Sequence, residues 1–474
     1  MSAALFVKEL LVFLRNRTAL ALGAALIVFV FAAAALGAQR SERIAFERAA
    51  AEAADREAWV SQGVRNPHAA AHFSRYAFKS FSALAAFDPG VADYAGLAVW
   101  MEAHQQSPAV FRRAEDLGAS HRLASINSAW ILQVLVPLLV FVALHASIAG
   151  EREDGTLRQL SATGVSASTL VVGKLSAAVA ALALLLAPAL VGAVLIAAPR
   201  AASLGEPADV KLRIALLSCA YLVYIFIQAF LALGVSALFR QRRSAFLALL
   251  AVWAVSVVLI PRAGGDLALR LHPEPGVETF RTQLADAGDT LWSDPQFQTR
   301  ERDEVLARYG VARVEDLPFN YVGLTLQRSE ERAHPRFEAF YTSLGRIHDA
   351  QEKVLAQTSL LSPSMALAQL SSGLAATDRS HHEAFVHAAE AHRRVIMRQL
   401  NNDIQNNAGD DGYGYAADES LWRATAQFEY EPPSFVSMQR HYWTSALVLL
   451  GQLAVALVFA GFAVAHARLR SALQ

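Results

Sequence analysis

The sequence predicts an all-α protein that crosses a membrane six times and carries two large helical inserts on one side of it. Hydrophobic residues make up 54% of the 474 positions and charged residues only 18%, whereas a soluble globular chain has about 25% charged residues. The charges are absent from six stretches, each long enough to cross a hydrocarbon core of about 30 Å as a helix. This pattern excludes a soluble enzyme. The predicted spans are residues 18–38, 128–150, 175–198, 214–239, 245–261 and 442–467.

The distribution of Lys and Arg predicts the side of the membrane on which each connecting segment lies. Short cytoplasmic segments are enriched in these residues, and long translocated domains are largely exempt from the rule. The loop 199–213, with Arg200, Lys211 and Arg213, is the one short segment that goes against it. We therefore expect both termini in the cytoplasm. The predicted cytoplasmic segments are 1–17, 151–174, 240–244 and 468–474, and the predicted extracytoplasmic segments are 39–127, 199–213 and 262–441.

The segments around the spans are expected to be mainly helical. Residues 1–17 form an amphipathic pattern and predict a helix lying along the membrane surface. Residues 41–62 are rich in Ala, Glu and Arg without Gly or Pro, so they are expected to continue the first span outward as a rigid helix. The same composition predicts that both large inserts are mainly helical. In the second insert the expected helices are 301–309, 327–358 and 378–401, and turn clusters stand at 272–276, 409–412 and 431–433.

A dense cluster of charges follows the second span. It reads Gly-Glu-Arg-Glu-Asp-Gly-Thr-Leu from Gly150 to Leu157. Charges at a membrane exit must be solvated or paired, and Gly155 allows a sharp turn before a short helix. From the residues alone, this segment is interpreted as an ordinary charged loop that fixes topology.

This segment resembles the coupling element of the membrane subunits of ABC-2 type transporters, which carry an E-x-E-x-G-T-L motif and a trailing Gly-Lys, here Gly173 and Lys174. The resemblance implies a type V exporter-like fold and a permease subunit without enzymatic activity. It also implies a second copy or a paralogue in the bilayer, and two copies of a separate ATPase that binds ATP and Mg²⁺. The residues expected to contact that ATPase are Glu151, Arg152, Glu153, Asp154, Gly155, Thr156, Leu157, Arg240, Arg242 and Arg243.

A narrower resemblance concerns the second insert. The strings Leu-Ser-Pro-Ser at 361–364 and Leu-Ala-Ala-Thr-Asp-Arg-Ser-His-His at 374–382 are similar to a subfamily of these permeases defined by the domain DUF3526. Members are often labelled as permeases for multicopper-enzyme maturation, which is thin support for a copper role. The resemblance implies a location in the bacterial inner membrane and a periplasmic insert that a periplasmic protein could contact.

The chain is not expected to bind nucleotide or nucleic acid itself. A P-loop requires G-x-x-x-x-G-K-[ST]. The only Gly-Lys pair is Gly173-Lys174, where Ser168 stands in place of the first Gly and Leu175 in place of Ser or Thr. The 42 basic residues equal the 42 acidic residues, so no basic surface is available to neutralise a nucleic-acid backbone. The single cysteine, Cys219, excludes an intrachain disulfide.

Most of the 14 histidines fall in the two inserts, but their spacing predicts no metal site. His382 and His387 are five residues apart and lie about 140° apart on a helix, so they cannot share one zinc ion. His68 and His72 have the favourable i,i+4 spacing but no obvious third ligand. The remaining candidates, for a copper-binding alternative, are His381, His382, His387 and His392. Soft Cu(I) prefers Cys and Met.

Three glutamines lie within predicted spans: Gln133, Gln228 and Gln452. Such groups are costly in lipid, so they indicate either a translocation path or ordinary interhelical hydrogen bonds. The favoured function is coupling of ATP hydrolysis to export or extracytoplasmic handling of a substrate. Two alternatives stay open, namely an ATP-driven mechanotransmission complex without transport and a metal-maturation or metallochaperone role of the inserts.

Overall fold

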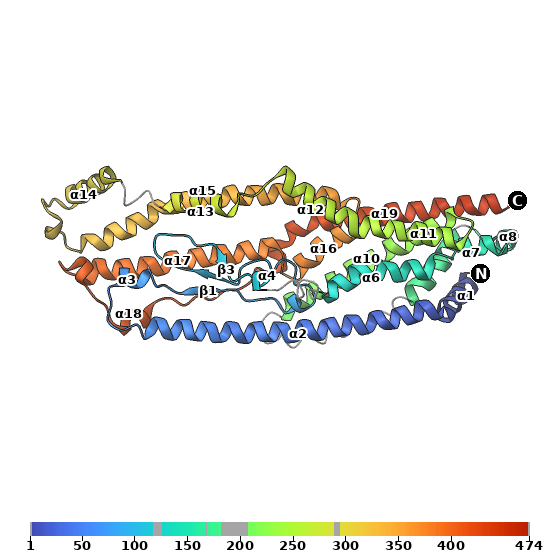
Figure 1. Ribbon diagram of the computed structural model, residues 1–474, viewed down its shortest axis with the longest axis horizontal. Helices are drawn as coiled ribbons and strands as arrows, with labels where there is room; N and C mark the ends of the chain where they lie inside the picture. Colours follow the sequence, from blue (N-terminus) through green and yellow to red (C-terminus); the bar gives the residue numbers. More distant parts are fainter. Residues whose placement is uncertain (1, 117–125, 167, 182–206, 289–293, 473–474) are drawn as a thin grey trace.

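The computed structural model describes residues 2–116, 126–166, 168–181, 207–288 and 294–472. The molecule is elongated and built from long helices, with both termini at the same end (Figure 1). Five described helices are long and apolar enough to cross a membrane. Most of the predicted third span, at 182–198, lies outside the described residues, and the part before it belongs to a shorter apolar helix, Ser168–Ala181. The five long candidates are Arg17–Val60, Ser128–Glu153, Asp209–Leu238, Arg242–Leu271 and Phe435–Arg470.

The N-terminal region forms two helices, α1 (Ser2–Arg15) and α2 (Arg17–Val60). Asn16 separates them, and its side chain accepts a hydrogen bond from the Ala19 N–H at 3.1 Å, which caps α2. Helix α2 continues without a break through its apolar part into the Ala- and Glu-rich part. The predicted helical continuation beyond the first apolar stretch is confirmed.

The apolar helices pack into a bundle at the end with the termini. It contains α6 (Ser128–Leu144), α10 (Pro207–Leu238), α11 (Arg242–Trp253), a π-helical turn η2 (Ala254–Leu259), α12 (Ile260–Leu271) and α19 (Phe435–Ala472). Helices α10 and α19 approach closely, because a Cβ at Gly234 would lie only 2.4 Å from the Phe459 ring. On α19, Val455 and Phe462 remain 70% and 75% exposed, as expected of side chains that face lipid.

The first insert differs from its prediction. After α2 it forms α3 (Pro67–Ala71), β1 (Tyr76–Phe78), η1 (Ala83–Ala86), β2 (Ala98–Trp100), β3 (Ala109–Val110) and α4 (Arg113–Asp116). The strands form an antiparallel sheet in the order β1-β2-β3, with Tyr76 opposite Trp100 and Ala98 opposite Val110. The prediction of a mainly helical first insert was wrong, because Pro and Gly interrupt helices here and aromatic residues pair across short strands.

The second insert is helical as predicted. It contains α13 (Val277–Gly288), α14 (Pro295–Tyr309), η3 (Val314–Asp316), α15 (Tyr321–Ser359), α16 (Pro363–Leu374), α17 (Arg379–Asn407), η4 (Gly412–Gly414) and α18 (Glu419–Ala424). The three expected helical stretches are confirmed within α14, α15 and α17, and all three predicted turn clusters lie between helices. Helix α16 packs against α6, α10 and α19, and Ala366 and Leu367 are fully buried. The insert therefore reaches into the apolar bundle.

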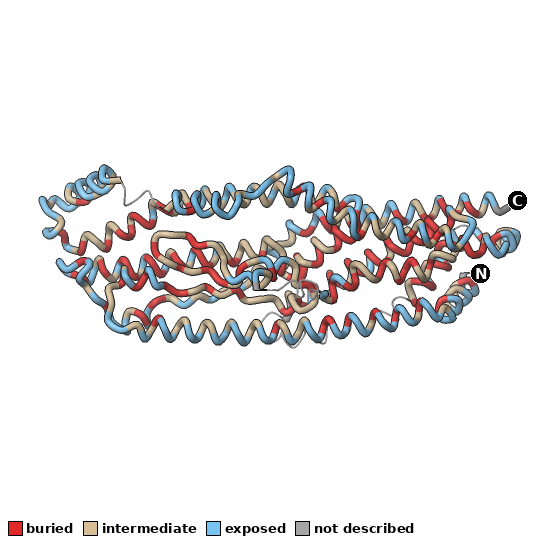
Figure 2. Tube along the Cα trace, in the orientation of Figure 1, coloured by how far each residue is buried: buried red, intermediate tan, exposed pale blue. Residues whose placement is uncertain are grey.

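Buried residues form two main hydrophobic cores (Figure 2). One fills the bundle and includes α16. The other lies toward the opposite end, where Trp59 at the end of α2 packs edge-on against Trp422 of α18, with ring centroids 5.5 Å apart. Phe385 and Met397 of α17 belong to the same core. Helix α2 extends from the end with the termini into the far half of the molecule, where α15 and α17 lie, whereas α19 lies in the half with the termini (Figure 1).

Candidate functional site

The charged segment after the second span folds into a sharp turn between two short helices, α7 (Ala149–Glu153) and α8 (Thr156–Ala162). We call residues 149–162 the α7–α8 turn. Gly155 has a φ of 75°, in the left-handed region that favours glycine. Leu157 is 1% exposed and anchors α8 to the bundle, whereas Glu153, Asp154 and Arg158 face outward. The turn lies at the end of the molecule that carries both termini (Figure 1).

Glu151 is held inside a network of ion pairs. Its Oε1 atom lies 2.9 Å from Lys174 Nζ and 2.7 Å from Lys8 Nζ. Lys174 Nζ also lies 2.7 Å from Glu9 Oε1 of α1. The Lys174 side chain is 2% exposed, so its charge is stabilised by the two carboxylates rather than by water. The network joins the α7–α8 turn to α1 and to the apolar helix Ser168–Ala181, which contains Lys174.

Two arginines join the same turn to α10 and α11. Arg152 donates hydrogen bonds to the carbonyls of Ala237 and Phe239, at 2.9 and 3.2 Å, and so caps the C-terminal end of α10. Arg242, the first residue of α11, donates its backbone N–H to Glu153 at 2.9 Å and forms an ion pair with Asp154. A carboxylate at a helix N-terminus is stabilised by the exposed amides and the helix dipole.

The ten predicted contact residues therefore divide into two groups. Glu151, Arg152, Leu157 and Arg242 hold the turn against other elements, while Thr156 donates its hydroxyl to the Glu151 carbonyl within the turn. The exposed group is Glu153, Asp154, Gly155, Arg240 and Arg243, of which Glu153 and Asp154 contact Arg242. Sequence reasoning missed Lys8 and Glu9. The adjacent lysine and glutamate within a mainly apolar helix are the sequence feature that would have identified them.

A cleft of about 650 Å³ lies between α1, α6 and the α7–α8 turn. Lys8, Glu9, Glu151, Lys174 and Arg242 are among its lining residues. Charged side chains of both signs therefore line this cleft.

The three glutamines in the predicted spans lie on three different helices, α6, α10 and α19. Gln133 of α6 donates a hydrogen bond to Tyr221 of α10 at 3.0 Å. Gln452 of α19 donates to the carbonyl of Ser359 at 2.8 Å and caps the end of α15. Gln228 is 1% exposed, and its amide nitrogen has no hydrogen-bond partner among the described residues. The contacts of Gln133 and Gln452 are those of ordinary interhelical hydrogen bonds.

The Gln133 contact is the first link of a longer chain that sequence reasoning missed. Tyr221 hydrogen-bonds to Ser371 of α16 at 3.1 Å, and Ser371 donates to the buried carboxylate of Asp88 in the first insert. Burial raises the pKa of Asp88, although the Ser371 hydroxyl and the Gly90 N–H act in the opposite direction. The chain connects α6 and α10 of the bundle to both inserts.

Arg213, one of the basic residues in the loop that goes against the positive-inside rule, is buried on α10. It pairs with Asp209 at 2.5 Å and donates to the carbonyls of Gly373 and Leu374 at 3.3 Å. The carboxylate neutralises this charge locally. Arg213 therefore acts as a packing residue that holds α16 on α10.

His381 and His382 lie at the start of α17. His381 Nδ1 is 2.5 Å from Asp378 Oδ1, and the residue is 2% exposed. Burial, helped by Lys79 and Arg112, lowers the pKa of His382 to about 3. Within the residues that the structure describes, neither belongs to a group of three metal-ligating side chains.

The fold and the site together define a multi-pass α-helical membrane protein in which a charged turn is held against several apolar helices. The sequence matches the family model described as "ABC-2 family transporter protein" over residues 3–465. The chain belongs to this family, whose members generally are membrane subunits that pair with an ABC ATPase. No curated protein matches the sequence.

Proposed function

We propose that the chain is the permease subunit of an ABC transporter and that a separate ATPase docks on the α7–α8 turn and on the neighbouring residues Arg240 and Arg243. The observation that supports the proposal is that this turn contacts other helices on one side and exposes charged side chains on the other. Its inner residues, Glu151 and Arg152, are bonded to α1, Lys174 and α10. Its exposed residues Glu153 and Asp154 are bonded to Arg242 of α11. Its outer side presents exposed charges. A force applied to the outer side would therefore reach several spans at once.

In this proposal both termini and the turn face the bacterial cytoplasm, and the inserts face the periplasm. Two ATPase copies bind ATP and Mg²⁺ beneath a pair of permeases, formed with a second copy or a paralogue. Closure of the ATPases would push on Glu153 and Asp154. Arg242 would transmit the displacement to α11, and Glu151 would transmit it to Lys174 and α1. The helices would then tilt as rigid bodies and export or present a substrate.

The second candidate function is mechanotransmission without transport. It is supported by the 44-residue helix α2, which continues from an apolar part into the polar far region without interruption. The chain from Gln133 through Tyr221 and Ser371 to Asp88 supports it as well. The narrower DUF3526 resemblance fits either function, because it concerns the insert and not the coupling turn.

The experiment is affinity purification in mild detergent, with mass spectrometry to identify a co-purifying chain that carries a P-loop. The test variant is Arg240→Glu/Arg243→Glu, which reverses two exposed charges beside the turn. Its matched control is Arg300→Glu/Arg308→Glu, the same reversal at two exposed positions of α14 at the far end. We avoid Glu151→Arg because it would break the buried network and the fold together.

We expect the test variant to lose at least about tenfold in recovered ATPase, equivalent to about 1.4 kcal/mol, and the control variant to lose nothing. Equal recovery with both variants would contradict the docking surface. Reconstitution in proteoliposomes separates the two candidate functions. ATP-dependent movement of a substrate across the bilayer supports transport, and ATP hydrolysis with movement of the inserts alone supports mechanotransmission.

A further inference from the structure

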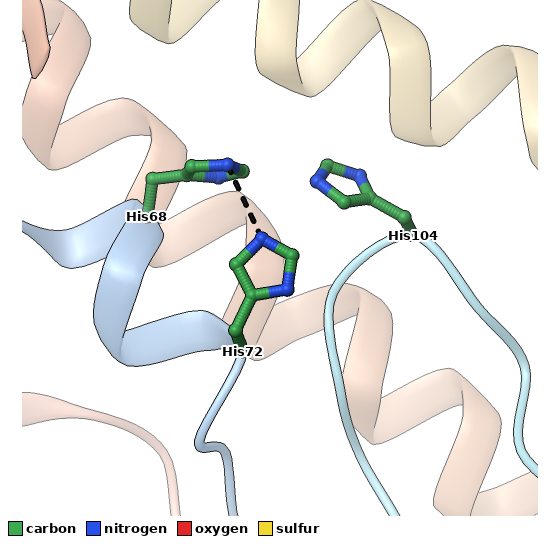
Figure 3. Close-up of side chains that lie close together, drawn as sticks. All are labelled: His68, His72 and His104. Atoms are coloured by element: carbon green, nitrogen blue, oxygen red, sulfur yellow. Dashed lines mark hydrogen bonds between the residues drawn. The ribbon is translucent and has the colours of Figure 1, made fainter. Parts of the chain in front are cut away.

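Three histidines from two separate segments of the first insert meet near α3, toward the far end of the molecule. His68 lies in α3 and His72 ends it, while His104 lies in the loop between β2 and β3. One ring nitrogen from each lies within 4.8 Å of the other two. The Nε2 atoms of His68 and His72 are 3.4 Å apart (Figure 3). His104 is the third ligand that the i,i+4 pair lacked in the sequence.

The spacing suits a metal ion. Zinc–imidazole bonds are about 2.0–2.1 Å long, so two nitrogens in a tetrahedral site lie about 3.3–3.4 Å apart. His68 and His72 already have this separation. In Figure 3 the His104 ring faces the other two across a small gap. Because His72 is exposed, its side chain can rotate to complete the site without repacking a core.

The contact of His104 with a buried carboxylate is typical of metal-binding histidines. Its Nδ1 atom lies 3.0 Å from Glu330 Oε1, and its backbone N–H donates to the same carboxylate at 2.6 Å. Glu330 is 3% exposed, and its other oxygen lies 2.9 Å from Arg393. In metal sites, a carboxylate that accepts from one ring nitrogen of a histidine fixes the tautomer and orients the ring toward the metal. The two contacts of the Glu330 carboxylate with His104 therefore fix the orientation of the His104 ring.

The backbone around the cluster is fixed by bonds that cross between segments. The side chain of Asn66 accepts from the N–H of His68 at 2.9 Å and donates to the carbonyl of Tyr415 at 2.8 Å. Ala103 donates its N–H to the Ala71 carbonyl at 3.1 Å, which ties the His104 loop directly to α3. His104 has a φ of 63°, a strained conformation for a residue other than glycine that is enriched at functional sites.

We propose that His68, His72 and His104 form a binding site for a divalent transition-metal ion of the zinc class, with Glu330 as the positioning residue for His104. Three imidazoles without a thiol or thioether suit Zn²⁺ or Cu²⁺ and disfavour Cu(I). Three protein ligands leave a fourth position for water or an incoming ligand. The ion would join α3 and the β2–β3 loop, and through Glu330 it would fix the first insert to α15. The site does not depend on the proposed function of the coupling end.

The test is metal titration of the full-length protein in detergent, purified with a tag that contains no histidine and stripped with EDTA. Co²⁺ is the probe, because tetrahedral Co²⁺ gives a visible absorption that Zn²⁺ then abolishes. We expect one Co²⁺ per chain, displaced by Zn²⁺. His72→Ala and His104→Ala should abolish the signal, and Glu330→Gln should weaken binding by about 10- to 100-fold. His387→Ala, at an exposed histidine of α17, is the matched control and should bind as the unmodified protein does.

The unmodified protein tests the proposal without any variant. Absence of a stoichiometric Co²⁺ signal would overturn it and leave the histidines as a packed cluster of rings. Binding that persists in His72→Ala and His104→Ala would also overturn it, because the ion would then sit elsewhere. His72 is exposed, so loss of binding in His72→Ala with an unchanged circular dichroism spectrum reports on ligation and not on folding.

Discussion

At each end of the molecule a buried cation lies between two carboxylates from different segments. Near the termini, Lys174 Nζ lies 2.7 Å from Glu9 and 2.9 Å from Glu151. Toward the far end, Arg393 lies 2.9 Å from Glu330 and 2.7 Å from Glu390. Both cations are 2% exposed. The two sites differ in which cation is buried and in which other residues the carboxylates contact.

The difference indicates that one end is built to move and the other to stay fixed. Lysine is a point charge on a flexible stem, and the half-exposed Lys8 competes with Lys174 for the same oxygen of Glu151. In the proposed function, these partners would exchange when an ATPase pushes on the α7–α8 turn. Arginine presents a planar fork of donors, and Arg393 contacts Glu390 with both Nε and Nη2. That rigid contact holds Glu330, which in turn holds His104.

The largest expected effect comes from removing either buried cation. Lys174→Met or Arg393→Met removes the buried cation shared by two carboxylates, which should lower the free energy of unfolding by up to about 3–5 kcal/mol. The carboxylates keep weaker partners, which are Lys8 at the near end and Arg394 and His104 at the far end. Thermal unfolding in detergent, followed by circular dichroism, measures it. Lys8→Met is the control, because its partly exposed ion pairs should contribute no more than about 1 kcal/mol. A similar small loss in Lys174→Met would contradict the near-end network.

A pair of glycines in α15 tests the rigidity of the far end. A Cβ at Gly323 would lie 2.3 Å from the backbone nitrogen of Gln405 in α17, whereas one at Gly345 would meet nothing within 4 Å. Gly323→Ala should force the helices apart and cost about 1–3 kcal/mol. Gly345→Ala should stabilise the protein by about 0.5–1 kcal/mol through helix propensity. Unfolding midpoints that do not separate the two variants would refute close packing of α15 on α17.

A second pair of glycines separates coupling from stability. Gly155 in the turn and Gly310 after α14 have φ values of 75° and 65°, and an added Cβ would be unobstructed at both. Alanine at either position should cost about 1–2 kcal/mol from backbone strain alone. Only Gly155→Ala should also reduce ATPase stimulation by the permease. Equal ATPase rates in both variants would show that the shape of the turn is not used for coupling.

The smallest effect is expected for Asp88, which connects the first insert to Ser371 of α16. Because burial raises the pKa of Asp88 above its ordinary value of 3.8, the folded state favours the protonated acid. Its contribution to stability is present at low pH and is lost as the pH rises through the folded-state pKa. Asp88→Asn should abolish this pH dependence and unfold at a temperature equal to or above that of the unmodified protein at pH 8. A matching pH profile in both proteins would contradict the raised pKa.

The sequence predicted the features that depend on neighbouring residues. Charge-free stretches marked the apolar helices because a lipid-facing helix excludes charges along its whole length. The motif from Glu151 to Leu157 marked the turn because glycine at position 155 permits its backbone conformation. The long polar helices α15 and α17 followed from composition.

The features that were missed depend on contacts between distant residues. Lys174 meets Glu9 across 165 positions of sequence, and His104 joins His68 and His72 from another segment. The strands of the first insert have two or three residues each, which is too short for an alternating pattern to show. Nothing in local periodicity reveals such pairings, because tertiary packing decides them.

The central claim, that the α7–α8 turn docks an ATPase, is tested most directly by site-specific photo-crosslinking in membranes. A photoreactive residue would replace Arg158, which is exposed on α8, and the control position is Glu304, exposed on α14 at the far end. We predict an adduct from position 158, and none from position 304, with a chain that mass spectrometry shows to contain a P-loop. Absence of that adduct from position 158, while the same ATPase still co-purifies, would contradict the account.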